Sequence, residues 1–236
     1  MKKLKRCDIL SINKTIKELK MSYKLAIFDL DGTILDTIDD LADAVNHALT
    51  ENSLPTRTVA EVRSFVGNGM RLLIERSVPE GTDTAVTDAV FEEYKTYYKA
   101  HSTVKTRPYD GICDMLTSLR ARGVKLAVLS NKADPSVKEL CKLYFPGIFD
   151  YVAGEKPSVA RKPAPDAVNA ILDELGFDRA DSVYIGDSDV DIETARNAEM
   201  DCISVTWGFR DEKALTEAGA MTLAHTVSEL EYAILG

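Results

Sequence analysis

Two aspartates separated by one residue lie near the start of the chain, directly after an apolar segment. They are Asp29 and Asp31 in the sequence Asp29-Leu30-Asp31-Gly32-Thr33. Side chains two positions apart in an extended chain point the same way, so both carboxylates can face one site. Gly32 permits a tight turn that exposes backbone N–H groups to an anion. The segment therefore indicates nucleophilic or acid–base chemistry on an anion, and its simplest alternative is an acidic strand-to-loop turn.

Two further polar segments lie where such a site would need them. Ser130-Asn131 ends a second apolar run, and it supplies a hydroxyl and an amide where parallel strands terminate and ligands usually bind. Lys162 comes shortly before Pro165, which favours the first position of a helix and so fixes the lysine on the preceding loop. Taken singly, a Ser-Asn turn and a solvated lysine are the simpler interpretations.

A group of acidic residues follows a third apolar run. Asp187, Asp189 and Asp191 alternate with other residues there, and crowded carboxylates repel one another unless a cation neutralises them, which favours a divalent metal ion. An EF-hand loop is excluded because Ile192 stands where that loop needs glycine and Ala198 where it needs a bidentate glutamate. Asp189 is interpreted as a solvated residue at a helix start rather than as a ligand.

The elements that must position these residues alternate between strands and helices. Apolar, β-rich runs predict buried strands at residues 25–30, 125–130, 182–185 and 202–207. Helical apolar spacing predicts helices at residues 112–122, 136–143, 165–175 and 192–200. This alternation is typical of an α/β fold with a Rossmann-like parallel sheet that helices cover on both faces.

One long stretch after the first strand contains helical patterns alone. They predict helices at residues 38–52, 59–66, 70–78 and 83–100. We interpret residues 37–106 as an inserted all-helical cap domain, and residues 21–36 with 107–236 as the α/β core. The sequence Arg-Pro-Tyr-Asp-Gly at 107–111 is the expected return hinge, because proline and glycine punctuate the re-entry.

The composition excludes several function classes. The net charge of −9 argues against nucleic acid as the main partner, because phosphate-backbone binding needs a concentrated basic surface. A small anionic substrate stays compatible with it, since local cations or a metal ion can invert the field inside one cleft. No apolar run approaches a membrane span, and the cysteines lack the spacing of a zinc site or a disulfide framework. A cytoplasmic protein with reduced thiols, active as a monomer or a homodimer, is expected.

The first twenty residues differ from the rest in charge, with seven lysine or arginine residues against Asp8 and Glu18. They lack the long apolar stretch and the small-residue cleavage site of a signal peptide. Residues 1–20 are therefore interpreted as an N-terminal extension. It is either a disordered tail or over-extended reading frame ahead of Met21, or an amphipathic surface helix.

Taken together and in this chain order, the polar segments resemble the motifs of the haloacid dehalogenase superfamily of phosphohydrolases. The resemblance covers nearly everything from Tyr23 onward, and the helical insert looks like the first type of cap in that superfamily. The residues that match its four motifs in order are Asp29 with Asp31, Ser130, Lys162, and Asp187 with Asp191.

Within the superfamily, the cap sequence resembles that of phosphoglycolate phosphatases. The match lies in Phe65-Val66-Gly67-Asn68-Gly69, with support from the segments at 29–37, 130–132 and 162–166. It implies that Gly67, Asn68 and Gly69 bind substrate, whereas a helix–helix turn is the simpler interpretation. Related pyrophosphatases and sugar-phosphate phosphatases share most of these residues and stay open as alternatives.

The resemblance also implies a mechanism. Asp29 attacks phosphorus to form a phospho-aspartate, while Asp31 protonates the leaving oxygen and later activates water. Mg²⁺ is expected at Asp29, the backbone carbonyl of Asp31 and Asp187, with Asp191 supporting this shell. Lys162 neutralises charge. The residues expected to hold the phosphoryl group are Gly32, Thr33, Ser130 and Asn131.

The expected reaction is hydrolysis of a small phosphorylated metabolite, with 2-phosphoglycolate giving glycolate and phosphate. A dehalogenase would have no use for Asp31, and a non-catalytic binding protein would tolerate loss of either aspartate. A β-phosphoglucomutase-like phosphomutase is disfavoured because such mutases commonly carry valine where Thr33 stands. A histidine phosphatase is unsupported, because His47, His101 and His225 lie outside any recognisable motif.

Overall fold

The computed structural model describes residues 23–236, so the predicted N-terminal extension at 1–20 lies outside the described residues. Its centre is a six-stranded sheet in the order β5-β4-β1-β6-β7-β8, in which every pairing is parallel. The predicted α/β class with a parallel sheet is confirmed. The strands are β1 (Leu25–Phe28), β4 (Lys125–Ala133), β5 (Tyr151–Glu155), β6 (Ser182–Gly186), β7 (Asp201–Val205) and β8 (Leu223–Ala224).

Helices cover both faces of this sheet. Side chains alternate along β1, so Ala26 and Phe28 enter one hydrophobic cluster while Leu25 and Ile27 enter the other. Burial on both faces explains why the central strands are continuous apolar runs. The first cluster includes residues of α6 (Ile112–Ala121), α7 (Asp134–Tyr144) and α11 (Val227–Leu235), and the second includes residues of α8 (Asp166–Leu175) and α9 (Asp189–Asn197). A 3₁₀ turn, η1 (Arg179–Asp181), and α10 (Glu212–Glu217) complete the core.

The predicted elements and the observed ones differ mainly at the sheet edges and at one helix start. The edge strands β5 and β8 were not predicted, and neither were α10 and α11. Most of β5 is only partly buried, and β8 has two residues, so neither shows a full apolar run. Helix α9 begins at Asp189 rather than at residue 192. The Asp191 carboxylate accepts hydrogen bonds from the backbone N–H (3.2 Å) and hydroxyl (2.6 Å) of Ser188, which extends the helix toward the strand.

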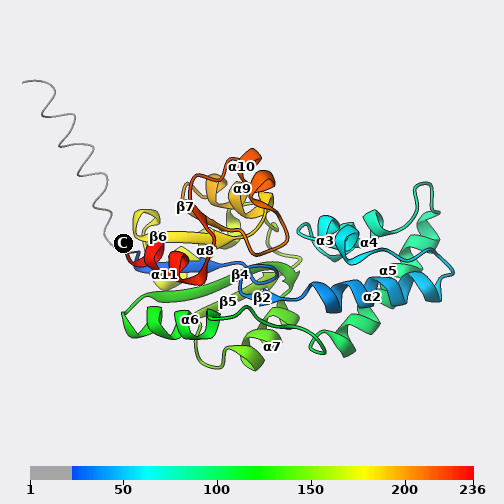
Figure 1. Ribbon diagram of the computed structural model, residues 1–236, viewed down its shortest axis with the longest axis horizontal. Coiled ribbons are helices and arrows are strands. Elements are labelled where there is room, and N and C mark those ends of the chain that lie inside the picture. The colour runs from blue at the N-terminus through cyan, green and yellow to red at the C-terminus, as the bar shows by residue number, and fades with distance from the viewer. Residues whose placement is uncertain (1–22) are drawn as a thin grey trace, which may run out of the picture.

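The insert consists of four helices with a hydrophobic cluster of their own. They are α2 (Ile38–Glu51), α3 (Val59–Phe65), α4 (Met70–Ser77) and α5 (Thr84–His101), and Figure 1 shows them grouped to one side, beyond the end of the sheet. Val45, Ile74 and Tyr94 are fully buried in this cluster, and Phe209 of the core joins it. The predicted all-helical insert is therefore present, whereas the cap domain bounds 37–106 stay a prediction.

The two chain segments that connect core and insert are tied to each other. The short strands β2 (Leu35–Asp36) and β3 (Arg107–Pro108) pair antiparallel. Beyond them, the buried Asp40 carboxylate accepts hydrogen bonds from the N–H groups of Lys105 (2.9 and 3.0 Å) and Thr106 (2.8 Å). The first turn of the insert is thus fastened to its last residues.

Among the helices described between residues 23 and 236, none combines the length and apolar character that a membrane span requires.

The Asp40 contacts give a stability prediction. Asp40→Ala leaves the N–H groups of the exposed Lys105 and the buried Thr106 without their acceptor, so it should lower the free energy of unfolding by about 1–3 kcal/mol. Urea denaturation measures this change. Asp39→Ala is the matched control on the same helical turn and should cost less than about 1 kcal/mol, because Asp39 is only partly buried. Equal losses for the two variants would contradict this account.

Candidate active site

Three neighbouring strand ends form the floor of a cleft. Strand β1 lies between β4 and β6, and because all three are parallel their carboxyl ends meet at one edge of the sheet. The chain order reverses at β1, which is where α/β sheets open a crevice for ligands. Asp29 follows β1, Ser130 and Asn131 lie near the end of β4, and Asp187 follows β6. All four line the cleft, together with Lys162 and residues of the insert.

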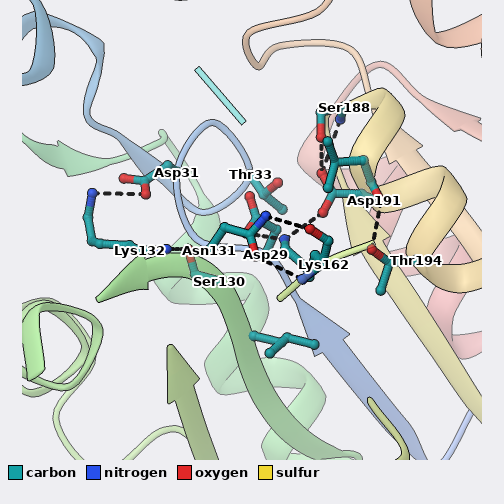
Figure 2. Close-up of polar contacts among 12 residues, drawn as sticks. Asp29, Asp31, Thr33, Ser130, Asn131, Lys132, Lys162, Ser188, Asp191 and Thr194 are labelled. Atoms are coloured by element: carbon teal, nitrogen blue, oxygen red, sulfur yellow. Dashed lines mark hydrogen bonds and ion pairs between the residues drawn. The ribbon is translucent and has the colours of Figure 1, made fainter. Parts of the chain in front are cut away.

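Lys162 occupies the centre of the polar group. Its ammonium lies 2.7 Å from Asp29 Oδ1 and 2.7 Å from Asp191 Oδ1, and 3.0 Å from the Tyr184 hydroxyl. The side-chain amide of Asn131 accepts from the Lys162 N–H (2.9 Å) and donates to the Lys162 carbonyl (3.0 Å). Figure 2 shows these contacts converging from different elements. Asn131 thus fixes the backbone of the lysine, and the lysine fixes two carboxylates.

The Asp187 carboxylate accepts hydrogen bonds from two donors, and two glycines lie close against it. The donors are the Thr33 hydroxyl (3.2 Å) and the Phe209 N–H (2.6 Å). A Cβ at Gly32 would lie 2.3 Å from Asp187 Oδ2, and one at Gly208 would lie 2.4 Å from it. Gly32 also has a positive φ of 86°. Glycine is therefore required on both sides of this carboxylate.

The turn at Gly32 and Thr33, which was predicted to bind an anion, makes hydrogen bonds within the protein. The Gly32 N–H donates to the Leu35 carbonyl (2.8 Å), and the Thr33 N–H faces the Leu30 carbonyl at 3.4 Å. The Thr33 hydroxyl serves Asp187 instead. These groups support the acidic centre and the turn. Substrate binding by Gly32 and Thr33 stays a prediction. The Gly32 N–H is already bonded to the Leu35 carbonyl, so it is not free to bind an anion.

Three buried carboxylates share a small volume. One oxygen each of Asp29, Asp187 and Asp191 lie within 4.8 Å of one another. Burial raises the pKa of Asp29 to about 7. The charge of Lys162 opposes this rise, and the charge of Asp191 adds to it. Burial, with the charges of Asp191 and Asp29, also raises the pKa of Asp187 well above its usual range. One ammonium against three carboxylates leaves negative charge uncompensated, and oxygen donors of this kind suit a hard divalent cation such as Mg²⁺.

The Asp31 side chain points to a different partner. Its Oδ2 lies 2.9 Å from the Lys132 ammonium, which also donates to the Tyr98 hydroxyl of helix α5 at 2.9 Å. Figure 2 shows this pair to one side of the Asp29–Lys162–Asp191 group. Asp31 Oδ1 is buried and has no hydrogen-bond partner among residues 23–236. Lys132 was not predicted as a site residue, although its place directly after Ser130-Asn131 was the available signal.

The turn at residues 67–69 lies over the cleft and is held from the core. The Asn131 amide donates to the Gly67 carbonyl at 3.1 Å, and Gly67 and Gly69 both line the cleft. The Asn68 side chain turns elsewhere, since its carbonyl oxygen accepts from Arg76 at 3.1 Å. Among the three predicted cap residues, the glycines therefore lie at the site, and the substrate-binding role of Asn68 stays a prediction.

Arg210 is a second core residue that forms hydrogen bonds with the insert. Its guanidinium donates to the carbonyls of Arg63 (3.1 Å) and Val66 (2.8 Å), and it contacts Asp189 at 3.3 Å. Neither Arg210 nor its neighbour Phe209 was predicted at the site, because they lie outside every motif and reach the cleft only through the fold.

Comparisons with known proteins agree with this geometry. A family model described as haloacid dehalogenase-like hydrolase matches residues 26–205. The chain belongs to this family. A phosphoglycolate phosphatase of Agrobacterium fabrum is 35% identical over 195 residues, covering 79% of this chain and 82% of that protein. One from Mesorhizobium japonicum is 31% identical over 209 residues, covering 87% and 92%.

A solved structure extends the likeness to the whole fold. The crystal structure of a provisionally named phosphoglycolate phosphatase from Lactobacillus delbrueckii subsp. bulgaricus is 42% identical to this chain, with a TM-score of 0.88. The match covers 92% of this chain and 100% of that one. The resemblance predicted from the motifs, to haloacid dehalogenase-type phosphatases close to phosphoglycolate phosphatases, is confirmed. The chain is a hydrolase with phosphatases as its relatives.

The central lysine gives a prediction that depends on pH. Lys162→Met removes the cation that opposes the raised pKa of Asp29, so that pKa rises further above about 7. When the pKa of a carboxyl is higher in the folded protein than in the unfolded chain, the free energy of unfolding falls as the pH rises from the unfolded pKa to the folded pKa. We therefore expect a loss of roughly 3–5 kcal/mol at about pH 8 and a smaller loss at about pH 5.5, where the carboxyl is protonated.

Urea denaturation of the metal-free protein at both pH values measures this difference. Lys138→Met is the matched control, because the Lys138 side chain is 54% exposed and its partner Asp134 also contacts Lys156, so its removal should cost less than about 1 kcal/mol at either pH. A loss for Lys162→Met that is the same at both pH values would show that buried carboxylate charge is not the cause.

Proposed function

We propose that the protein hydrolyses a small phosphate monoester, with 2-phosphoglycolate as the preferred substrate, through a phospho-aspartate on Asp29. The observation that carries this proposal is the position of Asp29. It is a buried carboxylate at the junction of three strand ends, held 2.7 Å from Lys162 and grouped with Asp187 and Asp191. The names of the sequence relatives support the choice of substrate.

The first half of the reaction forms the covalent intermediate. Lys162 holds Oδ1 of Asp29, which orients the carboxylate for in-line attack on phosphorus. The bond from Asp29 oxygen to phosphorus forms as the ester bond breaks, and the departing oxygen takes a proton from Asp31. For this role Asp31 enters the step protonated, carrying the proton that it took from water at the end of the preceding turnover, and its carboxyl exchanges the contact with Lys132 for one with the leaving oxygen.

The second half releases phosphate. Asp31, now ionised, takes a proton from a water molecule that attacks the phospho-aspartate, and the bond between phosphorus and Asp29 breaks. Ser130 and Asn131 line the same cleft on the β4 side, where the Ser130 hydroxyl and the backbone N–H of Asn131 would hold the phosphoryl oxygens, since the Asn131 side-chain amide already donates to Gly67 and Lys162. The insert excludes bulk water from the site, and its opening and closing govern access.

Mg²⁺ fits the donor set of this site. The side chains of Asp29 and Asp187 and the Asp31 carbonyl would hold it, while Asp191 supports the group through its contacts with Lys162 and Ser188. When bound, Mg²⁺ supplies the positive charge that lets a carboxylate approach a phosphate dianion.

The catalytic roles are tested by phosphate release. Asp29→Asn should reduce kcat by at least about 10³-fold, because no other group can form the intermediate. Asp31→Asn should reduce it by about 10²- to 10⁴-fold, the usual contribution of general acid–base catalysis. Acid quenching followed by mass spectrometry should find phosphate on Asp29 in the unaltered enzyme. Undiminished turnover of Asp29→Asn would refute the mechanism.

The substrate is tested with a panel measured with and without Mg²⁺. We expect 2-phosphoglycolate to give the highest kcat/KM among small phosphate esters, pyrophosphate and hexose phosphates. A large preference for pyrophosphate or a hexose phosphate would reassign the enzyme to one of the alternatives that the sequence left open. Conversion of a sugar 1-phosphate to its 6-phosphate without phosphate release would identify a phosphomutase.

Metal binding is tested apart from activity. A ligand that binds only the folded state raises Tm, so Mg²⁺ should stabilise the unaltered protein against heat and Asp187→Asn should lose most of that gain. Asp189→Asn is the matched control, since its side chain is 57% exposed and turned to Arg210. The control should keep the full Mg²⁺ effect, and an equal loss in both variants would contradict the proposed ligand set.

A further inference from the structure

A buried hydroxyl on the insert has no role in the chemistry described so far. Tyr94 of helix α5 is completely buried and lines the cleft. Its hydroxyl has no hydrogen-bond partner among the described residues 23–236. Burying a hydroxyl without a partner costs stability, and phenylalanine would fill the same space without that cost. The hydroxyl therefore requires an explanation beyond packing.

The surroundings of Tyr94 make this hydroxyl distinctive. Of the described insert residues that line the cleft, the others are glycines or carry apolar side chains, namely Leu41, Val66, Met70 and Leu73. Burial raises the pKa of Tyr94, so the hydroxyl stays protonated and can donate. The insert thus presents one polar donor on an otherwise apolar wall.

A cation from the core lies on the same side of the cleft. Lys132 donates to Asp31 and to Tyr98, whose ring stacks on that of Tyr94 with centroids 5.6 Å apart and planes within 5°. An ammonium group has three N–H donors, so one remains after these two contacts. Opposite charge on Asp31 raises the pKa of Lys132 despite its burial, which keeps it charged.

Asp31 connects Lys132, one of these two donors, to the phosphoryl site. It is two residues from Asp29 and in contact with Lys132. An ester with its phosphorus at Asp29 and an anionic group near Lys132 would place its bridging oxygen beside Asp31, which is the residue that must protonate it. The order of the groups along the cleft matches the order of the groups in a short phosphorylated acid.

We propose that Tyr94 and Lys132 bind a carboxylate carried by the alcohol part of the substrate, close to the ester oxygen. This inference rests on the proposed function and deepens it by assigning the residues that recognise the carboxylate of such a substrate. The carboxylate accepts from the Tyr94 hydroxyl and from the remaining N–H of Lys132, and these charge-assisted bonds fix the ester oxygen at Asp31.

Tyr94→Phe tests the proposal, because it removes the donor and leaves the Lys132–Asp31 contact in place. With 2-phosphoglycolate, kcat/KM should fall by roughly 10- to 100-fold, mainly through KM, since a site built to pair with a polar group discriminates by its donors. With ethyl phosphate, which has no carboxylate, it should fall by less than about threefold. The urea midpoint of the variant should be equal to or above that of the unaltered protein.

The matched control is Tyr97→Phe on the same helix. Tyr97 stacks between His47 and His101 and is not among the residues that line the cleft. Its variant should retain the unaltered ratio of kcat/KM for the two esters, which separates loss of the Tyr94 donor from a general effect of tyrosine substitution in α5.

Four outcomes would overturn the inference. Equal losses on both esters, with or without a lowered urea midpoint, would assign Tyr94 a structural role. An unchanged kcat/KM for 2-phosphoglycolate would show that the hydroxyl does not contact substrate. An unaltered enzyme that hydrolyses ethyl phosphate but not 2-phosphoglycolate would refute carboxylate recognition while leaving the phosphatase intact. Hydrolysis of neither ester, with Mg²⁺ present, would refute the proposed function itself.

Discussion

The arrangement depends on one buried ammonium that holds two carboxylates together. Lys162 contacts Asp29 and Asp191 at 2.7 Å each, and Asp187 adds a third negative charge nearby. Removing these charges from water is costly, and packed apolar residues would often be at least as stable. The sheet tolerates the group because it sits where three strands end, so no strand pairing is interrupted. The remaining negative charge gives the site its affinity for a cation, which a neutral core would lack.

The same side chains that hold the charged group also hold the insert in place. Asn131 braces the backbone of Lys162 and donates to the carbonyl of Gly67, so one amide spans core and insert. Lys132 reaches Tyr98, and Arg210 reaches two carbonyls of the segment before the glycines. Opening of the insert must break these polar contacts, which are individually weak because each is exchanged for a contact with water. The polar contacts that hold the insert therefore also hold the lining of the cleft.

Much of this could be predicted from the sequence, and the exceptions have a common cause. The central strands and the insert helices were predicted because two-sided burial and helical periodicity leave strong local patterns. The paired aspartates, Lys162 and Asp187 could be assigned because each follows or precedes such an element. Tyr94 and Arg210 could not, since a helix-face tyrosine and a loop arginine have ordinary local context. Their significance comes from contacts between segments far apart in the chain.

The cleft divides its charges between two ends, and this division bears on selectivity. At the sheet end, carboxylates and Lys162 suit a metal ion and a phosphoryl group. At the insert end, Lys132 contacts Asp31, and the Tyr94 hydroxyl lies on an otherwise apolar wall. A neutral alcohol would leave the Tyr94 hydroxyl buried without a partner, and the missing hydrogen bond would count against it. A ligand with negative charge at both ends would pair with both sets of donors, so the proposed carboxylate contacts would also select the alcohol part of the substrate.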